Sequence, residues 1–195
     1  CNTNTTNNAT NNATNNVYEN DVNTIKDNKK EIDILSVFWS VPIISYIKPM
    51  NGIIKKQILI KSDNEEQLNN VKERLLNVTE HYEELIITSI NNPEGRIKFK
   101  DIRKISIGTS KKDIVSFRCK KKSAFDNCVV FIMRLNIQGT FKEFHIKLFN
   151  TGKVEIPGVK EQYVFTMILD NLIKMLNPYV NLYLLPLSDN NMEVL

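Results

Sequence analysis

The chain has 195 residues, of which 42% are hydrophobic and 25% are charged, as in an ordinary globular protein that is long enough to bury a core. Its three cysteines show no CxxC spacing, which argues against both a disulfide framework and a zinc site, and no apolar run approaches the roughly 20 residues of a membrane span. We therefore expect an intracellular, reduced protein without a signal peptide or a membrane segment.

The net charge of +4 is distributed unevenly along the chain. Between Arg96 and Phe125, eleven lysines and arginines stand against Asp101 and Asp113, which gives this segment a net charge of +9. Such asymmetry is typical of a surface that binds a polyanion. The alternative is a solvated surface whose counter-charges lie nearby in space.

Residues 1–30 are rich in Asn and Thr and hold few apolar side chains, so we expect a disordered tail. Residues 34–47 are rich in β-branched and aromatic side chains but contain Pro42, which predicts an edge strand or a loop. A strand is predicted at 53–60, and another at 85–90. Between them a helix is predicted at 65–78, with Ser62 and Glu65 as its capping box.

The pattern becomes sharper after residue 100. Strands are predicted at 102–109 and at 128–138, where apolar side chains alternate strictly, and a hairpin at 141–156 turns at Asn150, Thr151 and Gly152. Counting back from this turn pairs Leu148 with Val154, Ile146 with Ile156, and Lys147 with Glu155. A helix is predicted at 162–176 and ends before Pro178.

Strands followed by a packing helix predict an α+β fold in which one face of the sheet is covered and the other is bare. Phe144, Ile146 and Leu148 would form the core side of the hairpin. Phe149 breaks the alternation, because it falls on the polar side with Glu143, His145 and Lys147. It either tucks over the end of the hairpin or serves as a wedge that inserts between base steps of bent DNA.

Two segments resemble one lobe of the TATA-box-binding proteins. The sequence NCVVFIMRL at 127–135 is similar to the second strand of that lobe, and IKLFNTGKVEIPG at 146–158 is similar to its central hairpin. The segments GRIKFKDIRKISIG at 95–108 and RCKKKSAF at 118–125 resemble the divergent versions of giant DNA viruses, the mimivirus group and its relatives. The lobe would cover residues 100–178, with a curved antiparallel sheet and helices on its convex face.

The resemblance implies roles for individual residues. Phe149 would be an intercalating phenylalanine, Thr151 and Lys153 would contact phosphates, and Arg134 would contact the DNA backbone. Val130 and Ile132 would lie on the concave face, against the minor groove. We expect further contacts from the positive charges of Lys147, Lys120, Lys121 and Lys122.

Three residues depart from the family pattern. Cys128 stands where the second wedge phenylalanine belongs, and Glu155 and Pro157 replace residues that touch base edges. The Glu155 carboxylate would face the phosphates, which is unfavourable unless the carboxylate is paired with a cation. Lys147 is the predicted cross-strand partner of Glu155. Two hypotheses therefore stay open: a DNA-binding protein, or a module of the same fold that binds proteins and has lost DNA binding.

The resemblance implies a viral transcription factor that binds AT-rich promoter DNA in the minor groove and helps to initiate transcription. Its partners would be viral transcription factors or RNA polymerase, in a viral factory of the host cytoplasm or in the nucleus, or packaged in the virion. Residues 31–99 would be an N-terminal α/β extension. Residues 179–195 would connect to a second lobe outside the chain.

We do not expect an enzyme. His81 and His145 are the only histidines, and neither has a nucleophile or a metal ligand at useful spacing. The phosphate-loop, dinucleotide and hydrolase motifs do not occur. We therefore expect no cofactor, no metal and no small-molecule substrate.

Overall fold

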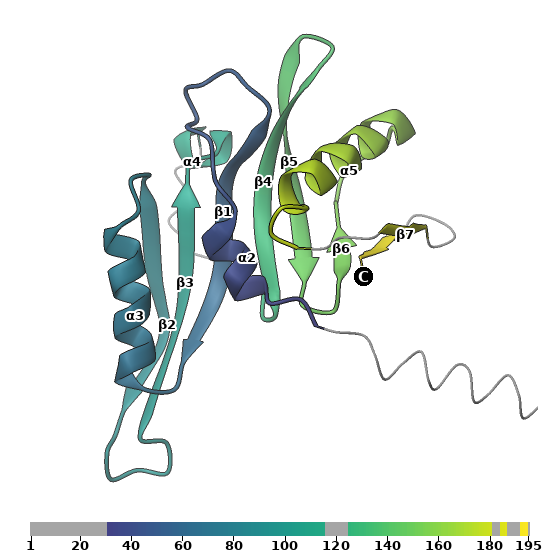
Figure 1. Ribbon diagram of the computed structural model, residues 1–195. Helices are drawn as coiled ribbons and strands as arrows, with labels where there is room; N and C mark the ends of the chain where they lie inside the picture. Colours follow the sequence, from purple (N-terminus) through teal and green to yellow (C-terminus); the bar gives the residue numbers. More distant parts are fainter. Residues whose placement is uncertain (1–30, 116–124, 181–183, 187–191, 195) are drawn as a thin grey trace, which may run out of the picture. The chain divides into compact units, whose positions relative to one another are not determined.

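The computed structural model of the chain describes residues 31–115 and 125–180, together with the backbone of 184–186 and 192–194. The predicted tail at 1–30, the lysines at 120–122 and most of the expected connector at 179–195 lie outside these ranges. The described strands form one antiparallel sheet in the order β2-β3-β1-β4-β5-β6-β8-β7 (Figure 1). The strands are β1 (Gly52–Ser62), β2 (Tyr82–Asn91), β3 (Phe99–Gly108), β4 (Cys128–Ile137), β5 (Thr140–Phe149), β6 (Lys153–Glu155), β7 (Leu184–Pro186) and β8 (Met192–Val194).

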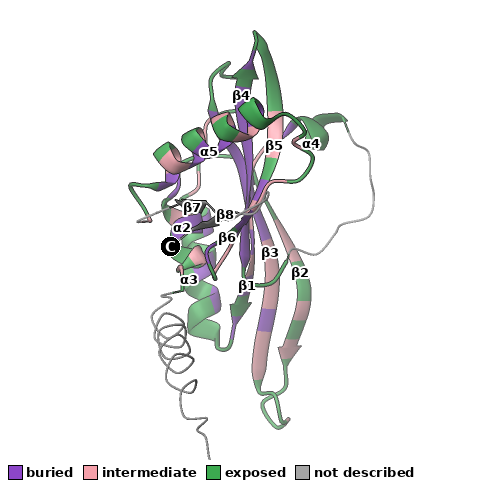
Figure 2. Ribbon diagram, turned by 90° about the vertical axis from the view of Figure 1, so that its right-hand side faces the viewer, coloured by how far each residue is buried: buried purple, intermediate pink, exposed green. Residues whose placement is uncertain are grey.

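The described residues also form four helices: α2 (Ile34–Ser40), α3 (Glu65–Leu76), α4 (Lys111–Val115) and α5 (Gln162–Leu176). Helices α2, α3 and α5 lie together on one face of the sheet, and the short α4 lies on the other (Figure 2). The α+β class and the antiparallel sheet are therefore confirmed. None of the described helices has the length and apolar character needed to cross a membrane.

The core lies between the sheet and the three helices of its first face, which we call the helix face. Phe131, Met133, Ile146 and Leu148 of β4 and β5 are fully buried there and belong to one apolar cluster with Ile168 and Leu172 of α5. Burial of this many large side chains is the main stabilising contribution to the fold. The predicted helix at 162–176 and its packing face are confirmed.

The predicted hairpin is formed by β5 and β6. Leu148 pairs with Val154 and Lys147 with Glu155, as the turn predicts, and Gly152 takes the left-handed conformation at φ 86°. The third predicted pair, Ile146 with Ile156, does not form because β6 ends at Glu155.

The prediction for residues 34–47 was wrong in its first half, which forms α2. Asp33 caps this helix, and its carboxylate accepts hydrogen bonds from the backbone N–H groups of Leu35 and Ser36 at 3.1 and 3.0 Å. Val37 and Phe38 are buried against the sheet, and this packing overrides the preference of β-branched residues for strands. Pro42 follows the helix in a loop, as expected.

The predicted capping box of α3 was also wrong. The N-cap is Asn64, whose side chain accepts a hydrogen bond from the N–H of Gln67 at 2.8 Å, while the Gln67 side chain accepts one from the N–H of Asp63 at 2.8 Å. Ser62 is the last residue of β1, where it pairs with Asp101 of β3. Strand pairing thus continues through Ser62, and the cap lies at Asn64, directly before the helix.

The central position of β1 joins the predicted N-terminal extension to the strands of the predicted lobe. This strand lies between β3 and β4 and pairs with both. The expected boundary between residues 99 and 100 falls inside β3, in the same continuous sheet. Residues 52–91 are therefore part of the sheet that carries β4 and β5.

Candidate nucleic-acid interface

The second face of the sheet, opposite the helix face, carries the residues that the resemblance assigns to DNA. We expected this face to be bare, but β4 is buried on both sides. Cys128, Val130 and Ile132 point to the second face and are only 1%, 9% and 3% exposed. These three side chains are therefore not available to a duplex in the described structure, contrary to the expectation for the concave face.

Arg134, which the resemblance assigns to the DNA backbone, is buried in the structure. Its guanidinium donates hydrogen bonds to the carbonyl oxygens of Tyr46 at 2.6 Å, of Lys48, and of Met50 at 3.4 Å. The rings of Tyr46 and Phe141 lie 5.5 and 5.3 Å from its central carbon. A guanidinium offers five N–H donors in a fixed planar arrangement, and in this structure backbone carbonyl groups of the same chain accept hydrogen bonds from them. Arg134 anchors the loop before β1 and does not face solvent as a phosphate contact would.

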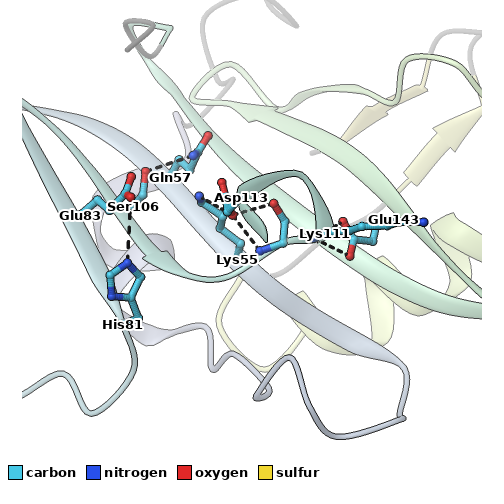
Figure 3. A network of polar contacts seen from close by, with 9 residues as sticks. Lys55, Gln57, His81, Glu83, Ser106, Lys111, Asp113 and Glu143 are labelled. Atoms are coloured by element: carbon cyan, nitrogen blue, oxygen red, sulfur yellow. Dashed lines mark hydrogen bonds and ion pairs between the residues drawn. The ribbon is translucent and has the colours of Figure 1, made fainter. Parts of the chain in front are cut away.

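Helix α4 covers another part of the second face through a polar network (Figure 3). Lys55 of β1 is buried and forms an ion pair of 2.8 Å with Asp113, which also accepts hydrogen bonds from the N–H and hydroxyl of Ser110. Burial alone would raise the pKa of Asp113, but the hydrogen bonds from Lys55 and Ser110 outweigh it and lower that pKa. The Glu143 carboxylate accepts a hydrogen bond from the Lys111 N–H at 3.0 Å, so α4 is fixed to both β1 and β5.

The end of the second face at β5 and β6 is different, because lysines and aromatic rings lie side by side there and are at least partly exposed. Lys147 Nζ lies 4.2 Å from the centre of the Phe125 ring, and Lys153 Nζ lies 5.9 Å from that of Phe149. Glu155 joins the two lysines through ion pairs of 3.0 Å to Lys147 and 2.9 Å to Lys153. We call these five residues the lysine–aromatic cluster.

The cluster brings together three of the predicted site residues: Lys147, Phe149 and Lys153. The predicted pair of Lys147 with Glu155 is confirmed. Hydrogen bonds from Lys153 and Lys147 lower the pKa of Glu155, so this carboxylate is ionised at neutral pH and offsets part of the positive charge. Phe149 is half-buried and stands outside the apolar core cluster, so the structure is compatible with both interpretations of this ring.

The remaining predicted site residues lie around this cluster. Thr151 and Pro157 are exposed, in the turn before β6 and in the segment after it. Cys128 pairs with Phe149 across the strands, and burial raises the pKa of its thiol to about 11, so the sulfur is neutral. The predicted contacts Lys120, Lys121 and Lys122 lie outside the described residues.

Sequence reasoning missed Phe125, whose side chain is 56% exposed beside Lys147. No periodic pattern assigns this residue to a face, because it precedes β4. Its position at the end of the basic segment and next to a strand was the only available signal.

Some charges of the basic segment have counter-charges in space, as the alternative interpretation expected. Arg103 of β3 pairs with Asp101 of the same strand at 2.6 Å and with Glu84 of the adjacent strand β2. Within the described part of the chain, no group of three His, Cys, Asp or Glu side chains could hold a metal ion.

Comparisons of the chain with protein families, with curated proteins and with solved structures find no match.

Proposed function

We propose that this chain is a DNA-binding transcription factor of the TATA-box-binding-protein type, and that it contacts DNA through the lysine–aromatic cluster. The observation that carries the proposal is that two rings, the exposed Phe125 and the half-buried Phe149, each lie beside a lysine on the face opposite the helices. Wedge proteins use such rings to unstack a base step, while neighbouring cations hold the phosphates. The quoted resemblance supports the same assignment, because it places Phe149 and Lys153 at the DNA.

The proposed contact differs from the one that the resemblance implies. With Arg134, Val130 and Ile132 buried, the centre of the second face cannot follow a minor groove in this conformation. The DNA would instead meet the sheet at β5 and β6, where it touches fewer residues. We therefore propose binding that depends on charge and on DNA shape more than on the reading of base edges.

The test measures the affinity of the full chain for an AT-rich duplex as a function of salt. Each phosphate contact contributes about −0.9 to the slope of log affinity against log salt, so Lys153→Ala should flatten the slope by about one. Lys98→Ala is the matched control, because Lys98 is equally basic and exposed but lies in the loop between β2 and β3. An equal effect of both substitutions would contradict the assignment of the site.

Phe149→Ala tests the wedge itself. We expect weaker binding and less bending of a doubly labelled duplex, with thermal stability nearly unchanged, because this ring lies outside the core cluster. Tyr163→Ala is the control, since Tyr163 is an exposed aromatic residue of α5 on the helix face. A core-sized loss of stability with unaltered DNA bending would show that Phe149 is a packing residue.

A second candidate function is a protein-interaction module of the same fold. The burial of β4 on both faces favours it, because this removes much of the surface that a duplex would need. The absence of any salt-dependent binding at low ionic strength would decide for this candidate.

A further inference from the structure

Strand β5 has one edge that is only partly used. It pairs with β4 over its whole length, from Thr140 to Phe149, whereas its other edge pairs with β6 only at Lys147 and Leu148. Among the described residues, no strand accompanies that edge from Thr140 to Ile146. The cause lies in β6, which ends at Glu155 before the chain turns through Pro157 towards α5. In Figure 1 the hairpin of β4 and β5 extends beyond β6.

A groove of about 870 Å³ runs along this open edge. Six consecutive residues of β5, from Thr140 to His145, line it, and Pro157 and Gly158 line it as well. An open strand edge presents unpaired backbone N–H and C=O groups, and proteins usually cover or blunt such edges. Here a hollow of the surface leaves room for one more extended chain.

We propose that this groove binds an extended, acidic segment of a partner protein, which adds to β5 as a further strand. Strand addition takes its affinity from main-chain hydrogen bonds and its specificity from the side chains beside the edge. The charged side chains among them are mostly basic: Lys111 and Lys142 line the groove, and so does Arg134, whose donors are already taken by the loop before β1. Glu143 is the only acidic residue of the lining.

The ion pairs of the region support an acidic partner. Neither Lys111 nor Lys142 forms an ion pair with a described residue, so both charges are available. The Glu143 carboxylate already accepts hydrogen bonds from the Lys111 N–H. The two lysines lie on opposite sides of the added strand. Lys142 shares the helix face with Phe144. Lys111, at the start of α4, lies on the second face, where Glu143 accepts a hydrogen bond from its N–H. Carboxylates on either side of the incoming strand would therefore meet a lysine.

A second copy of this chain is a poorer occupant of the same edge. Pairing of two β5 edges would bring the Lys142 and Lys111 side chains of both copies into one groove, and like charges on adjacent strands are destabilising. The charge of the groove thus selects against self-association.

The probe is a short peptide of repeated Glu-Glu-Val-Val with blocked ends, which presents carboxylates on both faces of an added strand. It is titrated into the full chain and followed by fluorescence anisotropy and by backbone NMR shifts. We expect binding with shifts confined to β5 and its neighbours. Lys111→Glu combined with Lys142→Glu should weaken it by about tenfold or more, since each charge reversal replaces an attraction by a repulsion. Lys98→Glu is the control for a general effect of charge and should leave binding nearly unchanged.

Two N-methylated forms of the peptide separate strand addition from simple charge attraction. In a strand, the N–H groups of successive residues point to opposite edges, so every second residue faces the same edge. Methylation of the set that faces β5 should abolish binding, while methylation of the other set preserves it. Equal binding of both forms, or no binding of the parent peptide at about 1 mM, would overturn the proposal. A dimer in sedimentation experiments that the double charge reversal dissociates would also overturn it, because a second copy would then occupy the edge.

This inference does not depend on DNA binding. Phe149→Ala should leave peptide affinity unchanged, because Phe149 does not line the groove. Failure of the peptide experiment therefore leaves the DNA proposal standing, and the reverse also holds.

Discussion

The two faces of the sheet are both buried along β4, but for different physical reasons. On the helix face, Phe131, Met133 and Leu135 meet other apolar side chains, and any tight apolar packing would satisfy them. On the second face, Arg134 and the β1 residue Lys55 are buried only because each has a specific polar partner. Alternation in the sequence therefore predicts burial on the helix face, whereas burial on the second face depends on partners far away in the chain.

The largest effect should come from the helix face. Phe131→Ala removes a ring with no exposed surface from the centre of β4, and it should lower the free energy of unfolding by about 3–5 kcal/mol. Urea unfolding measures this change. The matched control is Phe125→Ala, which removes the same ring from an exposed position and should cost less than about 1 kcal/mol. Equal losses would erase the distinction between the two sites.

Arg134→Ala tests whether the second face is held by polar contacts. It removes the charge-assisted hydrogen bonds to carbonyl groups of the loop before β1, so we expect a loss of about 2–3 kcal/mol in the free energy of unfolding. The salt slope of DNA binding should not change. A variant of unchanged stability with a slope flatter by about one would show instead that Arg134 contacts a phosphate.

Lys56 is the exception on the helix face, and it makes that face sensitive to pH. Its side chain is 6% exposed and donates a hydrogen bond of 2.6 Å to the carbonyl oxygen of Val41, beside the Phe38 ring. Burial lowers its pKa from 10.5 to about 8, against a smaller opposing effect of Glu80. Between pH 8 and 10.5 the unfolded chain therefore binds more protons at this site than the folded chain does, so the free energy of unfolding rises with pH over that window.

The test compares the wild type with Lys56→Met in urea unfolding at pH 7 and at pH 10. The wild type should gain about 2 kcal/mol relative to the variant over this interval, because the variant lacks the titrating group. Other groups titrate in both proteins, and their contributions cancel in the difference. A constant difference between the two proteins would mean that Lys56 keeps its ordinary pKa.

The smallest effect concerns the charges of the lysine–aromatic cluster. Glu155→Gln removes the carboxylate that joins Lys147 and Lys153, so both lysines should become more available to phosphates. We expect DNA affinity to rise by about two- to fivefold at low salt, the range of a partly exposed ion pair. Glu161→Gln, an exposed change of the same kind before α5, should have no such effect. Weaker binding of Glu155→Gln would show that the carboxylate orients the lysines for DNA.

Local patterns were enough to predict most elements and part of the site. The turn at residues 150–152 sets the register of β5 and β6, and this register alone pairs Lys147 with Glu155 and places Phe149 on the second face. Strict alternation likewise predicts β4, and an apolar stripe predicts α5. In these cases the residues that decide the outcome lie within a few positions of one another.

The remaining features depend on contacts that no local pattern encodes. The α2 segment is helical because Phe38 packs into the core, although its β-branched residues favour a strand. The hydrogen-bond partners of Arg134 lie 84 to 88 positions earlier in the chain. Its position in β4 therefore predicted which face of the sheet the side chain is on, but not that the side chain is buried there. Phe125 reaches Lys147 only through the tertiary fold.

The central place of β1 also governs the order in which the sheet can assemble. During synthesis β1, α3, β2 and β3 leave the ribosome before β4 and can pack together, but the second edge of β1 stays open until β4 follows. That edge carries Ile53 and Ile58, which are buried in the finished sheet. An open apolar edge is a template for pairing between chains, and contacts between distant strands form slowly. The growing chain is thus most prone to aggregate after β3 has emerged and before β4 pairs with β1.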